Sequence, residues 1–220
     1  MKDMMNETKS DNVQPGENRA FMQMRKPALE RLAGREAKDI AKKAGITYDE
    51  ENQVFHLNSL NQSIEITYPD YEMTPQLEQW QHLIILHYLD WADEVLPGNE
   101  LITFGLLKDG MVRGGGFDHQ CEQAIEQTLG KQSPEVIEEA CKSLGGKILS
   151  SNADLCAEFS FLPFYPVTLK IWFADDEFPA SGRMFLDKTA DHYLSVEDAV
   201  TVGALILDKL SDLVKCDNQV

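Results

Sequence analysis

Apolar residues recur every three or four positions in several stretches of the chain, and this spacing predicts helices. Over residues 27–44 the apolar stripe starts at Pro27, which suits a first helical turn, and ends before Gly45. We expect one amphipathic helix there, kinked at Gly34. A segment that opens with Thr74-Pro75 and is apolar on most of its circumference predicts a central buried helix over residues 74–89. Further helices are expected at residues 117–129, 133–144 and 195–213.

Two of the helices expected in the second half of the chain begin at a capping serine, and the third follows a run of glycines. Ser133 is followed by proline and glutamate, and Ser195 opens a capping box that ends at Asp198, so both serines are typical N-caps. The run Gly114-Gly115-Gly116 resembles an anion-binding loop ahead of a helix, but it lacks the phosphate-loop spacing and Asp118 would repel phosphate. We therefore interpret it as a flexible loop, one that could move over a pocket.

Short alternations of apolar and polar residues predict strands between the helices. They fall at residues 46–48, 54–57, 63–68, 101–104, 147–149, 157–161, 167–173 and 184–186. Strands and helices do not alternate regularly, which favours an α+β fold with a mixed or mainly antiparallel sheet packed against several helices. Residues 1–18 are polar and rich in turn formers, so we expect a mobile tail before a single domain over residues 19–217.

Composition narrows the classes of function. A net charge of −17 would repel a nucleic acid, and no apolar run approaches the roughly 20 residues of a membrane span. With no secretory signal in the sequence, we expect a cytoplasmic protein whose four cysteines are free thiols. Eight of the 20 basic residues lie between Arg19 and Lys43 and form either a solvated helix face or a docking surface for an acidic protein partner.

Acidic residues gather after the strand over residues 167–173. Carboxylate oxygens suit Mg²⁺ or Mn²⁺, and a histidine nearby could complete such a site. The alternative is that these side chains solvate turns and cap helices. The candidate metal ligands are Asp175, Asp176, Glu177, Asp187, Asp191 and His192.

A second candidate site would bind a small molecule. His87 is embedded in apolar sequence and is either a core histidine or an axial ligand of a tetrapyrrole; His82, five residues earlier on the helix, points roughly 140° away. The prolines of residues 162–166 predict a rigid elbow that presents Phe164 and Tyr165, and exposed rings there would form the wall of an apolar pocket. Trp172 joins this set, with the acidic loop at the far end of the same strand.

The sequence also resembles a known family. The motifs are the segments 172–179 and 185–198, together with Leu86-His87-Tyr88-Leu89, Gly145-Gly146 and residues 162–166. They are similar to the uncharacterised prokaryotic family catalogued as domain of unknown function 3786, over residues 27–213. The resemblance implies an anaerobic context, because relatives are sometimes fused to a four-cysteine iron–sulfur domain similar to one in corrinoid iron–sulfur proteins. That domain is absent here, and the family supplies no catalytic residue.

Three functions follow as hypotheses. The first is a non-catalytic accessory protein of anaerobic metabolism that binds a small molecule or a metallocofactor such as a tetrapyrrole or corrinoid. The second is a hydrolase that uses a divalent cation held by the acidic residues of segment 175–198. The third is a protein–protein interaction domain that uses the basic segment. The sequence contains no recognisable catalytic constellation.

Overall fold

The computed structural model describes residues 19–217, which form two antiparallel sheets and six α-helices. The first sheet has the order β1-β2-β3-β4, and the second has the order β5-β9-β8-β7-β6. Both sheets are antiparallel throughout, so the expected α+β fold is confirmed. The strands of the first sheet are β1 (Thr47–Asp49), β2 (Val54–Ser59), β3 (Gln62–Thr67) and β4 (Met73–Thr74). Those of the second are β5 (Leu101–Ile102), β6 (Lys147–Ile148), β7 (Leu155–Leu162), β8 (Tyr165–Trp172) and β9 (Ser181–Asp187).

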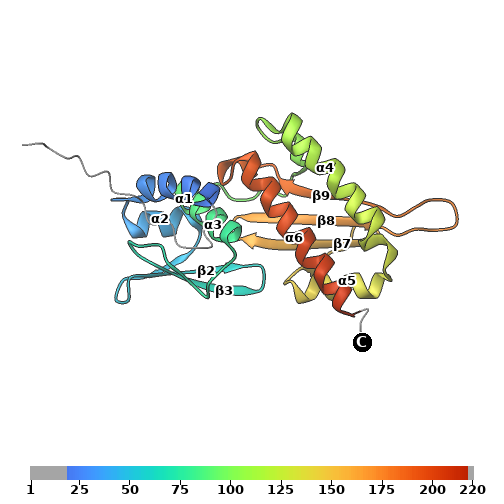
Figure 1. Cartoon of the computed structure of the whole chain (residues 1–220), viewed down its shortest axis with the longest axis horizontal. Helices are drawn as coiled ribbons and strands as arrows, with labels where there is room; N and C mark the ends of the chain where they lie inside the picture. The colour runs from blue at the N-terminus through green and yellow to red at the C-terminus, as the bar shows by residue number, and fades with distance from the viewer. Residues whose placement is uncertain (1–18, 218–220) are drawn as a thin grey trace, which may run out of the picture.

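The helices divide between the two sheets. Helices α1 (Arg19–Leu32), α2 (Ala37–Ala44) and α3 (Gln79–Trp91) lie with the first sheet, and α4 (Gly110–Gln127), α5 (Pro134–Ser143) and α6 (Val196–Asp217) lie on one face of the second (Figure 1). A single buried apolar cluster joins both halves, with Phe55 from the first sheet and Phe159 from the second. The backbone N–H of Leu60 also donates to the carbonyl of Ser160, 2.9 Å away, and so ties the turn between β2 and β3 to β7. Within residues 19–217, no helix is both long and apolar enough to span a membrane.

The expected helix over residues 27–44 is wrong in its extent. It is two helices, and Gly34 between them has φ +76°, which a right-handed helix cannot contain. Pro27 lies inside α1 rather than in a first turn, because α1 begins eight residues earlier at Arg19. The expected start at Thr74-Pro75 is also wrong: Thr74 ends β4, and α3 begins at Gln79. A residue before proline is biased toward extended backbone, which fits a strand better than a helix.

The glycine run is a further correction, because Gly114, Gly115 and Gly116 lie inside α4 and not in a loop. A Cβ on Gly114 would stand 2.1 Å from the carbonyl oxygen of Phe104, so this glycine lets the 3₁₀ turn η1 (Phe104–Leu106) pack against the helix backbone. Asp118 strengthens the same contact, since its carboxylate accepts hydrogen bonds from the N–H groups of Phe104 and Gly105. The expected mobile tail, residues 1–18, lies outside the described residues.

Candidate ligand-binding site

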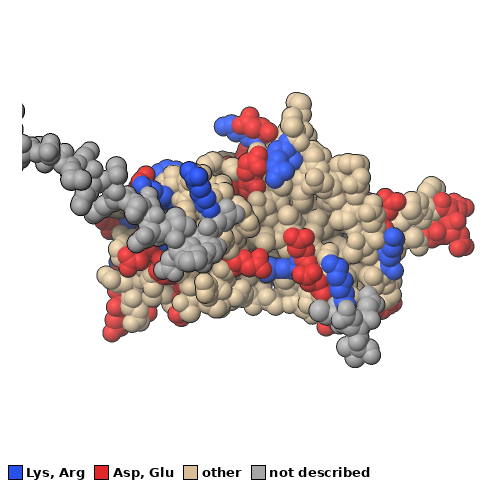
Figure 2. Space-filling model, viewed as in Figure 1, with Lys and Arg blue, Asp and Glu red and all other residues tan. Residues whose placement is uncertain are grey.

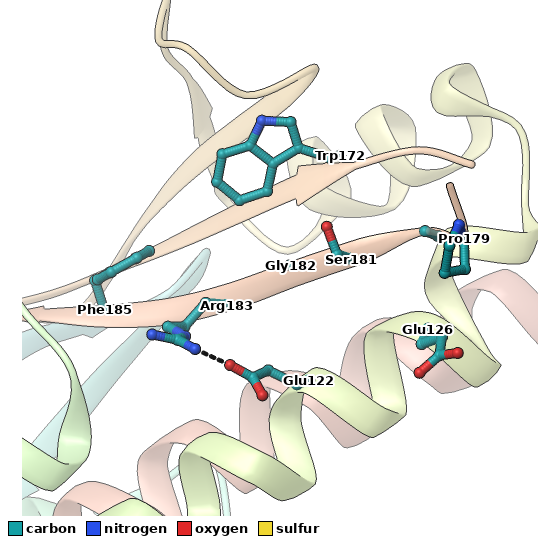
Figure 3. Close-up of a pocket in the computed structure, with 9 residues that line it drawn as sticks. Glu122, Glu126, Trp172, Pro179, Ser181, Gly182, Arg183 and Phe185 are labelled. Carbon is teal, nitrogen blue, oxygen red and sulfur yellow. Dashed lines mark hydrogen bonds and ion pairs between the residues drawn. The ribbon is translucent and has the colours of Figure 1, made fainter. Parts of the chain in front are cut away.

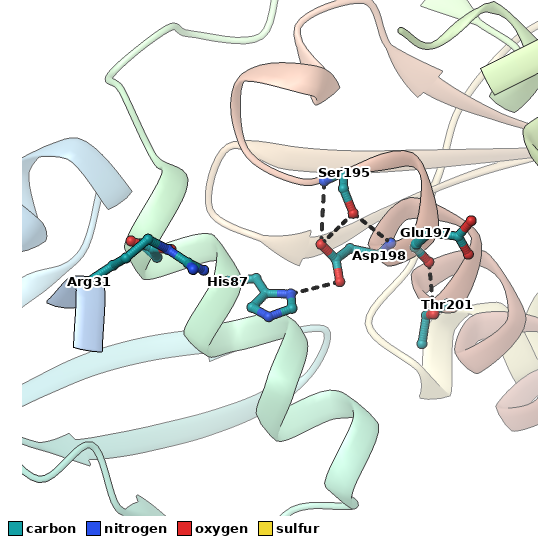
Figure 4. A network of polar contacts seen from close by, with 7 residues as sticks. Arg31, His87, Ser195, Glu197, Asp198 and Thr201 are labelled. Carbon is teal, nitrogen blue, oxygen red and sulfur yellow. Dashed lines mark hydrogen bonds and ion pairs between the residues drawn. The ribbon is translucent and has the colours of Figure 1, made fainter. Parts of the chain in front are cut away.

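Two side chains meet where α3 approaches the start of α6. The Nδ1 atom of His87 lies 2.8 Å from Oδ1 of Asp198, and the two side chains are only 12% and 7% exposed (Figure 4). The other carboxylate oxygen of Asp198 accepts a hydrogen bond from the hydroxyl of Ser195 at 2.7 Å, and the Asp198 N–H donates back to that hydroxyl at 3.2 Å. Asp198 therefore completes the N-terminal cap of α6 and orients His87 at the same time.

This arrangement determines what the imidazole can do. If Nδ1–H donates to Asp198, Nε2 carries the free lone pair, and no residue between 19 and 217 makes a hydrogen bond to Nε2. Nε2 is then available to a ligand, as an acceptor or as a metal ligand. The order of groups is not that of a serine hydrolase, in which histidine stands between serine and aspartate. Here Asp198 stands between them, so Ser195 is not activated as a nucleophile.

A groove of about 390 Å³ runs along α3 beside this pair. Its apolar walls come from α1, α3 and α6, and an ion pair between Arg113 Nε and Glu197 Oε2, 2.8 Å apart, lies at its rim. Residues Trp80, Ile84 and His87 follow helical spacing on one face of α3, so the imidazole lies one turn beyond the groove wall. The lining residues are Met24, Trp80, Leu83, Ile84, Arg113, Glu197, Asp198, Val200, Thr201 and Ala204.

The aromatic elbow lies close to the same network. Phe164 is half-buried, its ring centroid is 6.0 Å from that of Tyr193, and a Cβ on Gly45 would clash with it. Tyr165 is 1% exposed and belongs to the core, so it does not form the exposed pocket wall that the prolines suggested. Burial and the carboxylates of Asp198 and Asp191 raise the pKa of the Tyr165 hydroxyl far above its ordinary value. Phe164 and Tyr165 thus lie at the start of β8, and the Phe164 N–H donates at 3.1 Å to the hydroxyl of Tyr88, the residue that follows His87 on α3.

Trp172 lies at the opposite end of β8, with the acidic loop beyond it, as the sequence predicted. It lines a separate cavity of about 410 Å³ together with Phe185 of β9 and Glu126 of α4 (Figure 3). Arg183 and Glu122 form an ion pair across this cavity. The indole N–H of Trp172 donates to the carbonyl of Asn152 at 3.1 Å, which fixes the ring. Trp172 is therefore not part of the groove near His87.

The acidic candidates do not converge on one point. Asp175, Asp176 and Glu177 are exposed in the loop between β8 and β9, and Figure 2 shows acidic side chains at the tip of this projecting hairpin. Asp175 accepts hydrogen bonds from the N–H groups of Glu177 and Phe178, and these bonds lower its pKa. This is the turn-forming role that the sequence left as the alternative.

The remaining three candidates are engaged elsewhere. Asp187 is 2% exposed and accepts hydrogen bonds from Gly98, Asn99 and Thr189. His192 lies 2.8 Å from Asp93 on the surface, and Asp191 is exposed. Within residues 19–217, no group of three or more histidine, cysteine, aspartate or glutamate side chains is placed to hold a metal ion.

Acidic side chains of the same chain pair with most of the basic side chains between Arg19 and Lys43. Six of the eight basic side chains form ion pairs, and Asp90, 5% exposed, receives both Arg31 at 2.6 Å and Arg35 at 3.5 Å. This reduces the positive charge available to an acidic partner. The other pairs are Arg25–Glu72, Lys38–Glu50, Lys42–Glu94 and Lys43–Asp39.

Sequence reasoning named neither Asp198 nor Ser195 among its individual candidate site residues, although Asp198 ends the acidic segment 175–198. The capping box was visible and predicted the start of α6 correctly, but nothing local pairs it with His87. The buried hydroxyl of Tyr165 also carried no sequence signal of its own.

A family model described as "Domain of unknown function (DUF3786)" matches residues 36–209, which is most of the chain. A stretch of 84 residues is 38% identical to a Borreliella burgdorferi protein named "Probable 3-hydroxy-3-methylglutaryl-coenzyme A reductase". That stretch covers 37% of this chain but only 19% of the relative, so the chain spans about a fifth of that protein's length. No solved structure matches the chain.

Proposed function

We propose that this chain, which belongs to the DUF3786 family, is a non-catalytic accessory protein that binds a small molecule in the groove between α1, α3 and α6. The observation that carries the proposal is Asp198, which lines this groove and also holds Nδ1 of His87 at 2.8 Å. A buried carboxylate that fixes one imidazole nitrogen leaves the other nitrogen oriented for recognition. The anaerobic setting of the proposal rests on the family resemblance alone.

The shape of the groove supports binding of a compact ligand. Its volume of about 390 Å³ falls within the range of small-molecule pockets, roughly 300 to 1,000 Å³. Apolar walls with a few polar groups at one end are typical of such pockets, because burial supplies affinity and the polar groups fix orientation. Trp80, which is 38% exposed, offers an aromatic face at the wall.

A metallocofactor fits this site less well. A histidine that binds a metal through one ring nitrogen usually donates its other ring N–H to a carboxylate, as His87 can to Asp198, so the donor chemistry is suitable. The groove, however, is at the small end of the pocket range. A tetrapyrrole or corrinoid macrocycle is larger than a compact ligand and would project from the groove. We therefore propose that the groove binds a compact small molecule and not a macrocyclic metallocofactor.

The test is a small-molecule screen by NMR on protein purified without oxygen. Compounds that bind should shift the resonances of Trp80 and Ile84. His87→Ala should lower the affinity for these compounds about tenfold or more, since a polar contact in a desolvated site is lost. His56→Ala, on the exposed face of β2, is the matched control and should bind like the wild type. Equal binding by the His87→Ala variant, or no compound in the groove, would refute the proposal.

The alternatives have less support. A hydrolase that uses a divalent cation needs converging ligands, and the acidic candidates lie apart. A role in binding an acidic protein needs free positive charge, and most of the basic segment is already paired. The reductase name belongs to a relative of which this chain covers about a fifth, and we propose no reductase activity from it.

A further inference from the structure

The cavity beside Trp172 is a second candidate binding site, separate from the groove along α3. Its volume of about 410 Å³ falls within the range of small-molecule pockets, roughly 300 to 1,000 Å³. The end of β8 and the start of β9 form one wall, and α4 forms the other (Figure 3). The cavity and the groove share no lining residue, so a ligand in one leaves the other free.

Trp172 gives this cavity a fixed aromatic wall. Its indole N–H donates to the carbonyl of Asn152 at 3.1 Å, so the ring is held in one orientation and its polar group is already satisfied. The ring then offers a ligand its π face, which attracts cations. Phe185, the other ring that lines the cavity, already has the Lys170 ammonium 5.7 Å from its centroid. Within residues 19–217, no cationic side chain lies over the Trp172 ring in this way.

The charges that line the cavity leave a negative surplus. Glu122 and Glu126 of α4 and Arg183 of β9 all line it, and Glu122 is ion-paired with Arg183. Glu126 is exposed and forms no ion pair with any residue between 19 and 217. A cationic ligand would therefore compensate the Glu126 carboxylate, whereas an anionic ligand would be repelled by it.

The acidic loop between β8 and β9 acts in the same direction. It joins Trp172 to Pro179, which both line the cavity, and it carries three exposed carboxylates near its tip (Figure 2). In the part of the chain that the structure describes, none of the three pairs with a lysine or an arginine. Their field attracts cations toward this end of the molecule, and salt screens it beyond roughly 8 Å.

We infer that the cavity beside Trp172 binds a small organic cation, such as an alkylated ammonium. The aromatic wall attracts the positive charge, the Glu126 carboxylate compensates it, and the rings of Trp172 and Pro179 contact its alkyl groups. A metal ion is a poorer match, because it needs several converging oxygen or nitrogen ligands and residues 19–217 offer no such group of three. This site is independent of the proposed function, which concerns the groove.

Three probes of similar shape test the inference: choline, its uncharged isostere 3,3-dimethylbutan-1-ol, and the anion 3,3-dimethylbutanoate. Each is titrated into the isotope-labelled full chain, and NMR follows the backbone amides of Ser181 and Gly182, which line the cavity. Choline should bind about tenfold more tightly than its isostere, since the cation–π and Coulombic attractions act on the charge alone. The anion should cause no shift. Equal binding of choline and its isostere, or no shift with choline, would overturn the inference.

Two variants assign the attraction to this cavity. Glu126→Gln should weaken choline binding about threefold to fivefold and leave binding of the isostere unchanged, because it removes one charge from an exposed side chain. Glu51→Gln, in the exposed turn between β1 and β2, removes the same charge elsewhere and should bind choline like the wild type. Equal weakening by both variants would mean that choline responds only to the net charge of −17, and the inference would be wrong.

The indole resonance of Trp80 separates this inference from the proposed function, because Trp80 lines the groove and not the cavity. Choline should shift the amides of Ser181 and Gly182 and leave the Trp80 resonance in place. A shift of Trp80 alone would overturn the inference and leave the proposed function standing.

Discussion

The Nδ1 atom of His87 lies 2.8 Å from Oδ1 of Asp198, although 111 residues separate the two along the chain. Replacing Asp198 with asparagine should cost about 2 kcal/mol of unfolding free energy, because a nearly buried imidazole loses its charged acceptor while the cap of α6 is weakened. Urea denaturation at pH 7 measures this change.

The surface pair of His192 and Asp93 is the matched control for burial. Its atoms are also 2.8 Å apart, but its side chains are 43% and 46% exposed. Asp93→Asn should therefore cost at most about 1 kcal/mol, since water screens the interaction. If the two aspartate variants lose the same free energy of unfolding, then burial does not increase the contribution of the His87–Asp198 pair to stability.

His82 should make the protein sensitive to mild acid. Burial, with the nearby charge of Arg25, lowers the pKa of His82 from 6.5 to about 4. The unfolded chain takes up a proton near pH 6.5 and the folded chain does not, so stability should fall as the pH drops from 6.5 to 4 and then level off. We expect the free energy of unfolding to fall by about 2 kcal/mol between pH 6.5 and pH 4. This is less than the full difference in pKa between the folded and unfolded states would give, because the His82 side chain is partly exposed and water screens its interactions.

The variant His82→Phe isolates this contribution. Phenylalanine can keep the edge-on contact with Phe21, whose ring centroid is 5.8 Å from that of His82, and it cannot take up a proton. Its unfolding free energy should vary less between pH 6.5 and pH 4 than that of the wild type. His56→Phe, at an exposed position, should leave the wild-type pH dependence unchanged, and an equal flattening by both variants would contradict the assignment to His82.

Replacing Gly114 with alanine should change stability in the opposite direction from replacing Gly115 or Gly116, although all three lie in α4. A Cβ at position 114 would stand 2.1 Å from the Phe104 oxygen and 2.4 Å from its carbonyl carbon, so Gly114→Ala must displace η1 and should cost about 3 kcal/mol. Gly115 and Gly116 have open space around the added methyl. Alanine there should raise stability by about 0.5 to 1 kcal/mol, because glycine is unfavourable inside a helix. Thermal melting of the three variants gives the comparison, and uniform stabilisation would show that the helix does not need Gly114.

Local signals predicted much of this fold because their causes are local. Ser133 and Ser195 are caps whose partners lie three residues away, and α5 and α6 begin one residue after them. The prediction of a loop at Gly114 was wrong because a glycine run, considered alone, is typical of a loop. Glycine is needed at this position because of the contact with η1, ten residues earlier in sequence.

The candidate site was harder to predict for the same physical reason. His87 could be singled out because a titratable residue stood in an apolar helix, but its pairing with Asp198 exists only after α3 and α6 pack together. Phe164 and Tyr165 were found through the prolines beside them, whereas the burial of Tyr165 depends on helices elsewhere in the chain. The acidic run was visible as a cluster in sequence, yet the fold distributes its members over separate turns.

Asp187 should prove to be a loop anchor rather than a metal ligand. Its carboxylate accepts from the N–H groups of Gly98, Asn99 and Thr189, at 3.1, 2.6 and 3.0 Å, and from the Thr189 hydroxyl at 2.8 Å. Burial opposes its ionisation, but these hydrogen bonds outweigh burial and lower the pKa of the carboxyl. A lowered pKa contributes stability above the unfolded value of about 3.9 and loses it as the pH falls through the folded value.

Asp187→Asn should therefore destabilise the protein by about 2 kcal/mol at pH 7, because the uncharged amide keeps only one acceptor oxygen for several donors. Asp176→Asn, in the exposed loop, should unfold like the wild type. Melting of all three proteins with Mg²⁺, with Mn²⁺ and with a chelator should show no dependence on the cation, because the acidic side chains are engaged in separate turns. A cation-dependent rise in the wild-type melting temperature that Asp176→Asn and Asp187→Asn both abolish would instead favour the hydrolase hypothesis, since stabilisation by a bound ion requires a site present only in the folded state.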